Sequence, residues 1–555
     1  MKESVLKDCT ITFKNGEVIK FPHGTPFYKI SKAYKSKSQI VGALVNNKIV
    51  SLHERIEDDC TIEFLDINSK TGNKIYLAGL KMIFEYAFKR LFPKATVRYL
   101  YSLPRGMVAE IDYEKYLTKT DVAEINKVMS KIVSDNHVIE KLIVANNDGI
   151  DYYDKQLKNK VKADNIRNIT DPTIVLYRLD DIVNYYYSEM PYSTEVLSKF
   201  EIHYLGKNNF VLSWPTETDN GVTKEYVGYD AVIESYKNGK AWLDTMNIPY
   251  INDVNREITK GKINNFIKSC ELNFNLEINE TAKEIAKRGN IKCVMIAGPT
   301  SSGKTTVTKR LANYFAIYGL DPIVISLDDY FHERKDNPKD ENGEYDFECL
   351  QAIDLELLTN EMVKLFNGKQ ISVPKFNFVT GSKEISGKKI QLKENSIVLF
   401  EGLHALNDEA LPMISDLIKY KIYVSPYIPL CLDQHNYISL NDLRLIRRIV
   451  RDFRTRGYTV NETIKYWTKV RNGEEKHIIP YIHQANKIIN TSLPYEVGVL
   501  KVFVEPLLYS VPSDSKYYSE SRKLLSFLKQ FFAINSEYIP NDSILREFIG
   551  GAIDD

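Results

Sequence analysis

The residues with the clearest chemical meaning form a glycine-rich loop in the middle of the chain. The loop consists of Gly298, Pro299, Thr300, Ser301, Ser302, Gly303, Lys304, Thr305 and Thr306, and it follows the apolar run 291–297. A short apolar run of this kind predicts a buried strand, and we expect a helix to begin at Thr305. Successive backbone N–H groups at a helix N-terminus favour phosphate oxygens. The segment therefore predicts a P-loop, in which Lys304 reaches the β- and γ-phosphates of a nucleotide and Thr305 offers its hydroxyl to Mg²⁺.

Two acidic residues follow further predicted strands. Asp328 comes after the strand expected at 322–326, and Glu401 comes after the strand expected at 396–400. Active-site residues of open parallel sheets lie at such strand ends, so both carboxylates should converge on the P-loop. One can accept a proton from an attacking hydroxyl, and the other can hold Mg²⁺ or its waters. This is the minimum set of groups for phosphoryl transfer.

An arginine-rich segment lies between residues 441 and 457. On a helix, one apolar stripe would contain Leu443, Ile446, Val450 and Phe453. The remaining surface would be covered largely by Arg444, Arg447, Arg448, Arg451 and Arg454. Because arginine suits bidentate phosphate binding, we interpret the helix as a lid over the phosphates. A basic helix that binds RNA, or that is merely solvated, is the alternative.

Length and composition limit the class of protein. A chain of 555 residues is too long for one core, so several domains are expected. Its 74 basic and 73 acidic side chains give a net charge of +1, which predicts no general attraction to nucleic acid. Six scattered cysteines without a CxxC pair suit a reducing compartment. With no signal-peptide core and no apolar run of ~18 residues, we expect a soluble, cytoplasmic protein without membrane contact.

The order of motifs from 291 to 495 resembles the uridine kinase and phosphoribulokinase family. The P-loop is followed by Ser-x-Asp, Tyr345-Asp-Phe-Glu348, a Val373–Phe378 segment, Glu401-Gly402 and an RLxRRxxRDxxxRG segment. The resemblance implies an α/β P-loop kinase domain, with a parallel sheet flanked by helices. It also implies ATP and Mg²⁺ as cofactors, with Thr305 and Glu401 as the expected metal ligands.

The resemblance further implies catalytic roles at matching positions. Asp328 matches the catalytic base, which accepts a proton from a sugar 5′-hydroxyl as that oxygen attacks the γ-phosphate. Lys304 and Thr305 match the phosphate and magnesium ligands. Arg451 and Arg456 match lid arginines that neutralise the transferring phosphoryl group and thereby accelerate the reaction.

The acceptor-binding positions depart from the family pattern. Arg448 matches an arginine near the acceptor, Glu348 replaces the aspartate that binds the ribose hydroxyls, and Phe376 matches the aromatic residue that covers the base. Two base-reading positions are lost, since the family His matches Gly381 and the family Arg matches Tyr458. Losing two hydrogen-bonding side chains should weaken pyrimidine discrimination. A different nucleoside or a non-nucleoside alcohol therefore remains an alternative acceptor.

The first residues of the chain predict a small β-rich module. The turn Asn15-Gly16 predicts a hairpin, and further strands are expected at 41–50 and 61–65. Together with Pro22-His-Gly24-Thr25, Val45-Asn46-Asn47, Leu52 and Asp59, this pattern resembles the TGS domain, a small β-grasp fold, over residues 1–67. In that family the domain is a regulatory or RNA-contacting accessory. The lysines that could face a polyanion are Lys29, Lys32, Lys35 and Lys37, and a solvated lysine face is the alternative.

A predicted helix at 77–93 ends in Leu91-Phe92-Pro93, and a later strand-turn segment spans 177–183. On these features, residues 70–225 resemble the additional domain of threonyl-tRNA synthetases, an α+β fold. The family's HxxxH and CxxxH metal ligands match Ala78, Met82, Tyr186 and Met190, none of which can replace imidazole or thiolate. We therefore expect this fold without metal binding or editing chemistry. The neighbouring tyrosines at 185–187 could stack on bases, although packing is the favoured interpretation.

The remaining segments are a helical connector at 226–288 and a C-terminal helical appendage at 501–555, with the kinase domain at 289–500. The appendage is expected to pack on the kinase domain, and dimerisation is the alternative, so a homo-oligomer stays open. The sequence thus predicts an ATP-dependent nucleoside kinase with a small-molecule nucleoside substrate and an RNA contact through the TGS domain as an option.

The sequence also allows comparison with two other classes of P-loop protein. A nucleotide-sensing regulator that binds RNA or the ribosome would use the same P-loop without turnover. A GTPase is disfavoured because Asn486-Lys487 continues Ile-Ile instead of forming NKxD, and Asp340–Gly343 matches DxxG only in its letters.

Overall fold

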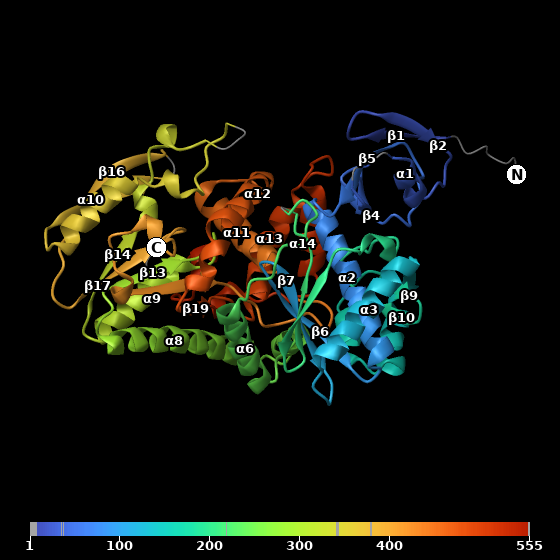
Figure 1. Ribbon diagram of the computed structural model, residues 1–555, viewed down its shortest axis with the longest axis horizontal. Coiled ribbons are helices and arrows are strands. Elements are labelled where there is room, and N and C mark those ends of the chain that lie inside the picture. Colours follow the sequence, from blue (N-terminus) through green and yellow to red (C-terminus); the bar gives the residue numbers. More distant parts are fainter. Residues whose placement is uncertain are drawn as a thin grey trace, which may run out of the picture.

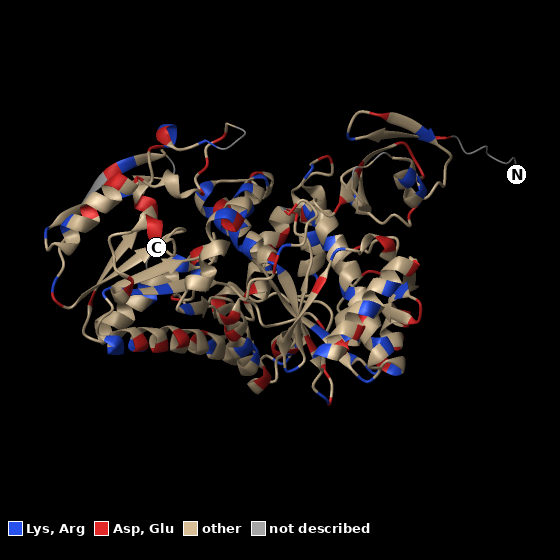
Figure 2. Ribbon diagram, in the orientation of Figure 1, with Lys and Arg blue, Asp and Glu red and all other residues tan. Residues whose placement is uncertain are grey.

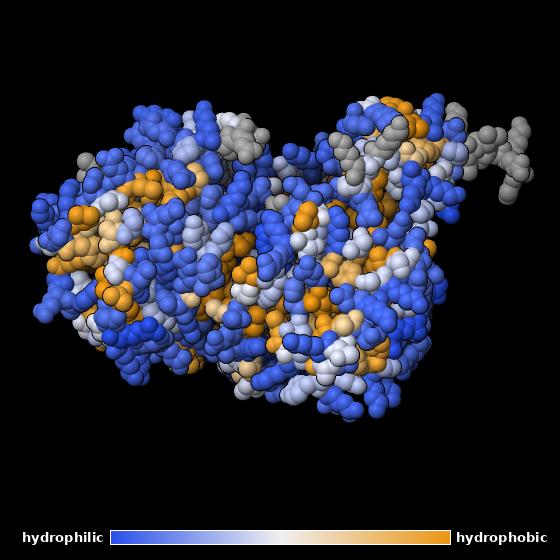
Figure 3. Space-filling model, viewed as in Figure 1, coloured by the Kyte–Doolittle hydropathy of each residue, from blue (hydrophilic) through white to orange (hydrophobic). Residues whose placement is uncertain are grey.

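The computed structural model describes residues 8–552 except 35, 37, 218, 340–342 and 378–379. The N-terminal segment forms one end of an elongated molecule, and the sheet that contains β13 lies at the other end (Figure 1). Basic and acidic residues are interspersed along the ribbon (Figure 2), and hydrophilic residues cover most of the face in view (Figure 3). Within the described part of the chain, no helix is both long enough and apolar enough to cross a membrane.

The N-terminal segment is a five-stranded sheet with one helix against it. The turn at Asn15-Gly16 joins β1 and β2 as an antiparallel hairpin, and β1 pairs in parallel with β5, so the sheet is mixed. Its elements are β1 (Cys9–Phe13), β2 (Val18–Phe21), α1 (Phe27–Ala33), β3 (Ile40–Val45), β4 (Lys48–Val50) and β5 (Cys60–Asp66). The expected hairpin and strands are present, while the assignment to the TGS family stays a prediction. Lys32 pairs with Glu195 at 3.5 Å, and Lys35 and Lys37 lie outside the described residues.

The next segment contains two antiparallel sheets against a long buried helix. The helix, α2 (Lys70–Leu91), is capped by Ser69, whose hydroxyl accepts a hydrogen bond from the Gly72 N–H. The sheets have the strand orders β11-β12-β7-β6 and β10-β9-β8. The other elements are β6 (Thr96–Leu103), β7 (Gly106–Asp112), α3 (Lys119–Asp135), β8 (Glu140–Ala145), α4 (Asn146–Asp151), α5 (Lys160–Arg167), β9 (Thr173–Leu179), β10 (Ile182–Asn184), β11 (Glu201–Gly206) and β12 (Asn209–Ser213).

The four positions that match synthetase metal ligands lie together in the core of this segment. Ala78, Met82, Tyr186 and Met190 are all buried in one hydrophobic cluster. Tyr186 also donates its hydroxyl to Glu85 at 2.9 Å, and Tyr185 is buried beside it. These tyrosines are packing residues, as the favoured interpretation held, and are closed to a stacked base.

The predicted kinase domain, called the kinase region below, contains a five-stranded parallel sheet with the order β14-β17-β13-β18-β19. Its strands are β13 (Cys293–Ala297), β14 (Asp321–Ser326), β17 (Ser396–Glu401), β18 (Lys419–Ser425) and β19 (Lys487–Asn490), and β15 (Ile371–Asn377) and β16 (Ser382–Ile390) form a separate hairpin. Its helices are α9 (Lys304–Ile317), α10 (Leu355–Phe366), α11 (Leu440–Arg456) and α12 (Val460–His477). The P-loop therefore follows the central strand, as the apolar run predicted.

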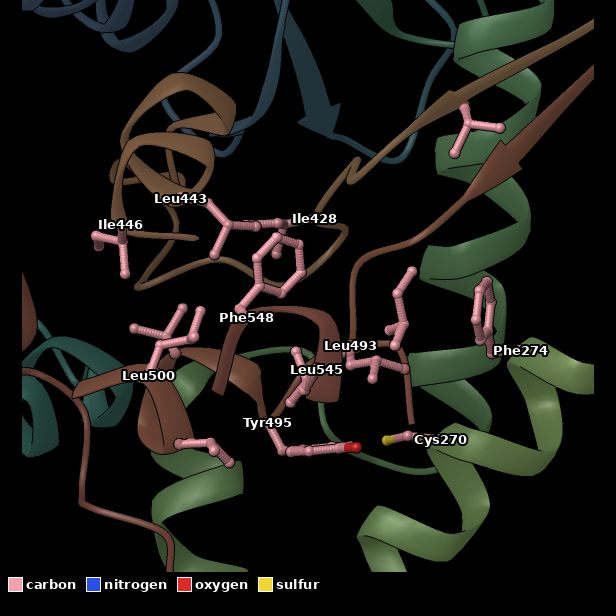
Figure 4. Packing of buried hydrophobic residues seen from close by; sticks show 14 of the residues in the cluster. Cys270, Phe274, Ile428, Leu443, Ile446, Leu493, Tyr495, Leu500, Leu545 and Phe548 are labelled. Carbon is pink, nitrogen blue, oxygen red and sulfur yellow. The ribbon is translucent and has the colours of Figure 1, made fainter. Parts of the chain in front are cut away.

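One hydrophobic core joins this region to segments before and after it. The preceding helices are α6 (Asp230–Thr245), α7 (Ile251–Thr259) and α8 (Ile263–Arg288), and the following helices are α13 (Glu496–Tyr509), α14 (Tyr518–Leu528) and α15 (Arg546–Ile549). Figure 4 shows Cys270 and Phe274 of α8 in the same core as Leu443, Tyr495 and Phe548. The C-terminal segment thus packs on the kinase region. The limits at 288 and 500 stay predictions, since the chain on both sides of each contributes to this core.

Candidate active site

The P-loop connects the end of β13 to the start of α9 at Lys304, one residue before the expected start. Ser301 (φ 61°) and Gly303 (φ 86°) have left-handed backbone conformations. A Cβ at Gly298 would overlap the carbonyl oxygen of Val424, so only glycine fits there. The hydroxyls of Ser301 and Ser302 are buried and have no hydrogen-bond partner among the described residues. This tightly turned, polar loop at a helix N-terminus fits a nucleotide's phosphates.

The side chains after the loop fit a magnesium nucleotide. Lys304 Nζ donates a long hydrogen bond of 3.4 Å to the Pro299 carbonyl. Thr305 donates its hydroxyl to Glu401 Oε1 at 2.9 Å, and Glu401 ends the neighbouring strand β17. Burial raises the pKa of Glu401 to about 7, and the charge of Lys304 opposes this rise. Hydroxyl and carboxylate oxygens are ligands that Mg²⁺ prefers, so this pair suits the ion.

Asp328 lies at the same edge of the sheet, in the short 3-10 helix that follows β14. Burial raises its pKa above the usual range, while Lys304 and Arg456 act in the opposite direction. The adjacent Asp329 is engaged elsewhere, because it accepts a hydrogen bond from the Phe376 N–H at 3.2 Å and pairs with Lys375. The Asp329 side chain is therefore directed to the β15 backbone and Lys375, which leaves Asp328 as the aspartate available at the P-loop.

The arginine helix α11 differs from the expectation. Arg444 and Arg447 are fully buried and Arg448 is only 6% exposed, so the prediction that arginines cover an exposed surface is wrong for these three. Arg444 pairs with Glu474 of α12, and Arg447 pairs with Glu496 of α13. The predicted apolar stripe is also wrong at its end, since Phe453 is 54% exposed. The reason is that α11 packs against α12, α13 and α15, which bury more than one face.

Arg444 and Arg447, the two fully buried arginines, contact the backbone of the P-loop. Arg444 donates to the Thr300 carbonyl through Nε at 3.1 Å and Nη2 at 3.0 Å. Arg447 donates to the Ser301 carbonyl at 3.4 Å and to the Thr491 carbonyl at 2.8 Å. Their guanidinium groups face backbone carbonyls and glutamates, so these residues shape the loop.

The other arginines of the lid motif surround one buried carboxylate. Asp452, which is fully buried, pairs with Arg448 at 3.0 Å, Arg451 at 2.7 Å and Arg456 at 3.7 Å. Burial alone would raise the pKa of Asp452, but Arg451, Arg448 and Arg456 together hold it below its ordinary value. Arg448 Nη1 is buried and has no hydrogen-bond partner among the described residues. Three positive charges are thus gathered with one neutralising carboxylate, leaving a net positive cluster.

The predicted acceptor residues occupy different environments. Burial, reinforced by Glu474, raises the pKa of Glu348 to about 7, and Arg448 opposes the rise. A Cβ at Gly473 of α12 would overlap the Glu348 side chain, so glycine permits this close approach. Phe376 is buried against Phe331, with ring centroids 5.7 Å apart.

The two positions that lack the family's base-reading side chains differ from each other. Gly381 (φ 71°) lies under the side chain of Arg334, and the backbone N–H of Arg334 donates to the Gly381 carbonyl at 2.8 Å. Tyr458 is partly exposed beside Tyr466, with ring centroids 5.8 Å apart. Phe378 and residues 340–342 lie outside the described residues. Asn486, from the Asn-Lys pair considered for a GTPase, exchanges hydrogen bonds with the Lys421 backbone at the start of β19.

Sequence reasoning assigned no role to the acidic partners of the arginines. Asp452 is four residues after Arg448, a spacing that predicts a helical ion pair and could have revealed it. Glu474 and Glu496 belong to other helices, and no local signal links them to α11.

These features define a P-loop domain of the phosphotransferase type. A profile of the phosphoribulokinase / uridine kinase family matches residues 293–496. A uridine kinase of Macrococcus caseolyticus is 31% identical over 196 residues, covering 35% of this chain and 85% of that protein. The uridine kinase of Ligilactobacillus salivarius is 27% identical over 207 residues, or 37% of this chain and 88% of that protein. The chain belongs to the phosphoribulokinase / uridine kinase family.

Other similar proteins cover the chain to a comparable extent. The uridine kinase of Saccharomyces cerevisiae is 30% identical over 197 residues, and the match spans 36% of that protein. A solved structure described as a possible uridine kinase from Bacillus stearothermophilus has 18% identity and a TM-score of 0.26, covering 39% of this chain and all of that one.

Proposed function

We propose that this protein is an ATP-dependent nucleoside kinase, which transfers the γ-phosphate of ATP to the 5′-hydroxyl of a nucleoside. The observation that supports the proposal is the meeting of Lys304, the Thr305–Glu401 pair and Asp328 at the carboxyl ends of adjacent parallel strands. The protein's family and the names of its relatives point to the same chemistry.

The P-loop residues 298–306 hold the phosphates of the donor. Lys304 exchanges its weak bond to the Pro299 carbonyl for the β- and γ-phosphate oxygens. Thr305 and Glu401 hold Mg²⁺, which when bound offsets the negative charge of the phosphates. Glu401 must be ionised to do so, and the positive charge of Lys304 favours that form.

Asp328 accepts the proton of the acceptor hydroxyl. Its raised pKa makes it a stronger base than an ordinary aspartate, while Lys304 and Arg456 keep the ionised form accessible. The hydroxyl oxygen gains nucleophilic character as its proton moves to the carboxylate. It then bonds to the γ-phosphorus while the bond from that phosphorus to the β,γ-bridging oxygen breaks, and ADP is the leaving group.

Arg451 and Arg456 supply positive charge as negative charge redistributes over the transferring phosphoryl group. Both form ion pairs with the buried Asp452, so their guanidinium groups are oriented before the substrate binds. Such preorganised charges stabilise the transition state at little cost in reorganisation. Arg448, whose buried Nη1 has no hydrogen-bond partner among the described residues, lies close enough to Glu348 for its charge to affect that carboxyl group, and both are assigned to the acceptor.

Glu348 accepts hydrogen bonds from the ribose hydroxyls of the acceptor. Phe376 and Tyr458 contact the base. The glycine at 381 with Arg334 over it, and the tyrosine at 458, favour a base preference that differs from that of uridine kinases. A kinase for another small hydroxyl acceptor is the second candidate, and the same two positions favour it.

The test is ATP consumption by the purified protein with a panel of purine and pyrimidine nucleosides, ribose and pantothenate. Turnover with one nucleoside that both Lys304→Ala and Asp328→Ala abolish is the expected result. If only a non-nucleoside alcohol supported turnover, the proposed acceptor would be that class of alcohol and no longer a nucleoside. ATP binding with no turnover on any acceptor would contradict the role of Asp328.

A further inference from the structure

The C-terminal segment 540–551 lies directly on the P-loop, although it is more than 230 residues away in sequence. A Cβ at Gly303 would overlap the Ile544 side chain, which is fully buried. Arg310 of α9 donates to the Asp542 carbonyl. In Figure 1 the C-terminal end of the chain lies beside β13 and α9. The segment is therefore a wall of the phosphate site.

The arginine helix fixes this segment from the other side. Arg454 donates to the carbonyl oxygens of Phe548 at 3.2 Å and Glu547 at 3.3 Å. Phe548 is buried under the guanidinium of Arg447, which lies 5.0 Å from the ring centroid. Figure 4 shows Leu545 and Phe548 pointing into the core between α11 and α13. The backbone around Glu547 is thus anchored at several points.

This arrangement brings a carboxylate to the start of α9. Thr306 donates its hydroxyl to Glu547 Oε2 at 3.0 Å. Thr306 is in the first turn of a 14-residue helix, at the end whose N–H groups and dipole attract anions. The loop and this first turn are the elements that cradle the α- and β-phosphates of a bound nucleotide. Glu547 is also close enough to Glu401 to affect its ionisation.

We propose that Glu547 is a residue of the donor site that competes with the nucleotide's phosphates for the N-terminus of α9 and thereby lowers the affinity for ATP. This inference rests on the proposed function only in taking a nucleoside triphosphate as the P-loop ligand. A carboxylate and a phosphate both carry negative charge and both seek the same donors, so binding of one disfavours the other. Nucleotide binding requires the Glu547 side chain to turn away from Thr306, while the anchored backbone stays in place.

Equilibrium binding to the full-length protein tests this without an acceptor. Glu547→Gln keeps the size of the side chain and removes its charge, so the dissociation constant for ATP should fall roughly three- to tenfold. Inorganic tripolyphosphate, which has neither base nor ribose, should bind more tightly by a similar factor. Glu547→Ala should do the same, and Glu537→Gln, at an exposed position shortly before this segment, should change neither constant.

The opposite results have separate meanings. Weaker ATP binding with unchanged tripolyphosphate binding would show that Glu547 contacts the ribose or base, and would overturn the proposal. Unchanged binding of both ligands would overturn it as well. Because no phosphoryl transfer is measured, a failure of the kinase assignment would appear only in the turnover assay. With an active acceptor, the KM for ATP should fall in Glu547→Gln.

Discussion

The guanidinium of Arg451 donates two hydrogen bonds to one oxygen of Asp452, from Nε at 2.9 Å and from Nη2 at 2.7 Å. Asp452 has no exposed surface and pairs with Arg448 and Arg456 as well. A single carboxylate therefore orients three arginines that the family resemblance assigns to the transferring phosphoryl group and the acceptor. The position of these charges depends on a residue that need not touch either substrate.

Asp452→Asn should impair both stability and catalysis. The variant leaves three guanidinium groups without their shared negative partner, and removing one partner of a buried ion pair costs about 3–5 kcal/mol. The free energy of unfolding, measured by denaturant titration, should fall by that amount. The value of kcat should fall because the arginines lose their orientation. Asp514→Asn, at an exposed position, is the control. Wild-type kcat in Asp452→Asn would show that the arginines need no such partner.

The pH dependence of acceptor binding should report Glu348. Burial raises its pKa from 4.5 to about 7 in the folded protein, and only the ionised carboxylate can accept from both ribose hydroxyls. The KM for the acceptor should therefore fall as pH rises through about 7 and then level off. Glu348→Gln should have a higher KM that no longer depends on pH in this range. An unchanged pH profile in Glu348→Gln would assign the titration to another group.

The same shift has a consequence for stability. A carboxyl group whose pKa is higher in the folded than in the unfolded state binds its proton more tightly in the folded state, and stays protonated there up to a higher pH. Between about pH 4.5 and pH 7 the folded protein thus binds more protons, and the contribution of Glu348 to stability decreases as pH rises. Glu401 has a pKa of the same size and acts in the same direction. The free energy of unfolding of Glu348→Gln should fall less steeply with pH over this interval.

Lys162 should couple the N-terminal half of the chain to the kinase region. Its buried ammonium group, on α5, lies 2.9 Å from His435 Nδ1 and 3.9 Å from Asp433, in the segment that precedes α11. Lys162→Met leaves the fully buried Asp433 without its positive partner, at a cost of about 3–5 kcal/mol. In scanning calorimetry the wild type should unfold in one transition, and Lys162→Met should unfold earlier or in two steps. Lys160→Met, at an exposed position of the same helix, is the control. One unchanged transition in Lys162→Met would contradict the coupling.

The sequence predicted those parts of the site that depend on neighbouring residues. The strands before Gly298, Asp328 and Glu401 are short apolar runs, and the structure places each within two residues of the expected bounds. The carboxyl ends of parallel strands meet at one edge of the sheet, so the convergence of these residues followed from strand type alone. The hairpin at Asn15-Gly16 was predicted for a similar reason, because the turn chemistry is local.

The sequence did not predict contacts between segments that are far apart in the chain. Helical periodicity identifies an apolar stripe, but it cannot show that α11 is surrounded by three other helices, so the burial of Arg444 and Arg447 was missed. Their partners Glu474 and Glu496 are 30 and 49 residues further along the chain. The contact between Thr306 and Glu547 spans 241 residues, and no local pattern signals it.

Substitution of the fully buried Arg447 should lower the free energy of unfolding more than substitution of the partly buried Arg451. Arg447→Met leaves the buried Glu496 without its partner and removes the hydrogen bonds to the Ser301 and Thr491 carbonyls. The free energy of unfolding should fall by about 3–5 kcal/mol. Arg451→Met leaves Asp452 paired with Arg448 and Arg456, so its stability should change by only about 1 kcal/mol.

The order of the two variants should be reversed for catalysis, since Arg451→Met should lose more activity than Arg447→Met. If Arg451 stabilises the transferring phosphoryl group, kcat in Arg451→Met should fall roughly 10²- to 10³-fold, the loss expected for one preorganised donor. The folded fraction of Arg447→Met should retain more activity than that, because Arg447 acts on the shape of the P-loop and not on the substrate. Lys268→Met, which removes an exposed positive charge from α8, controls for the change in net charge. If Arg451→Met kept wild-type kcat and lost the larger amount of stability, the division between lid arginines and structural arginines would be reversed.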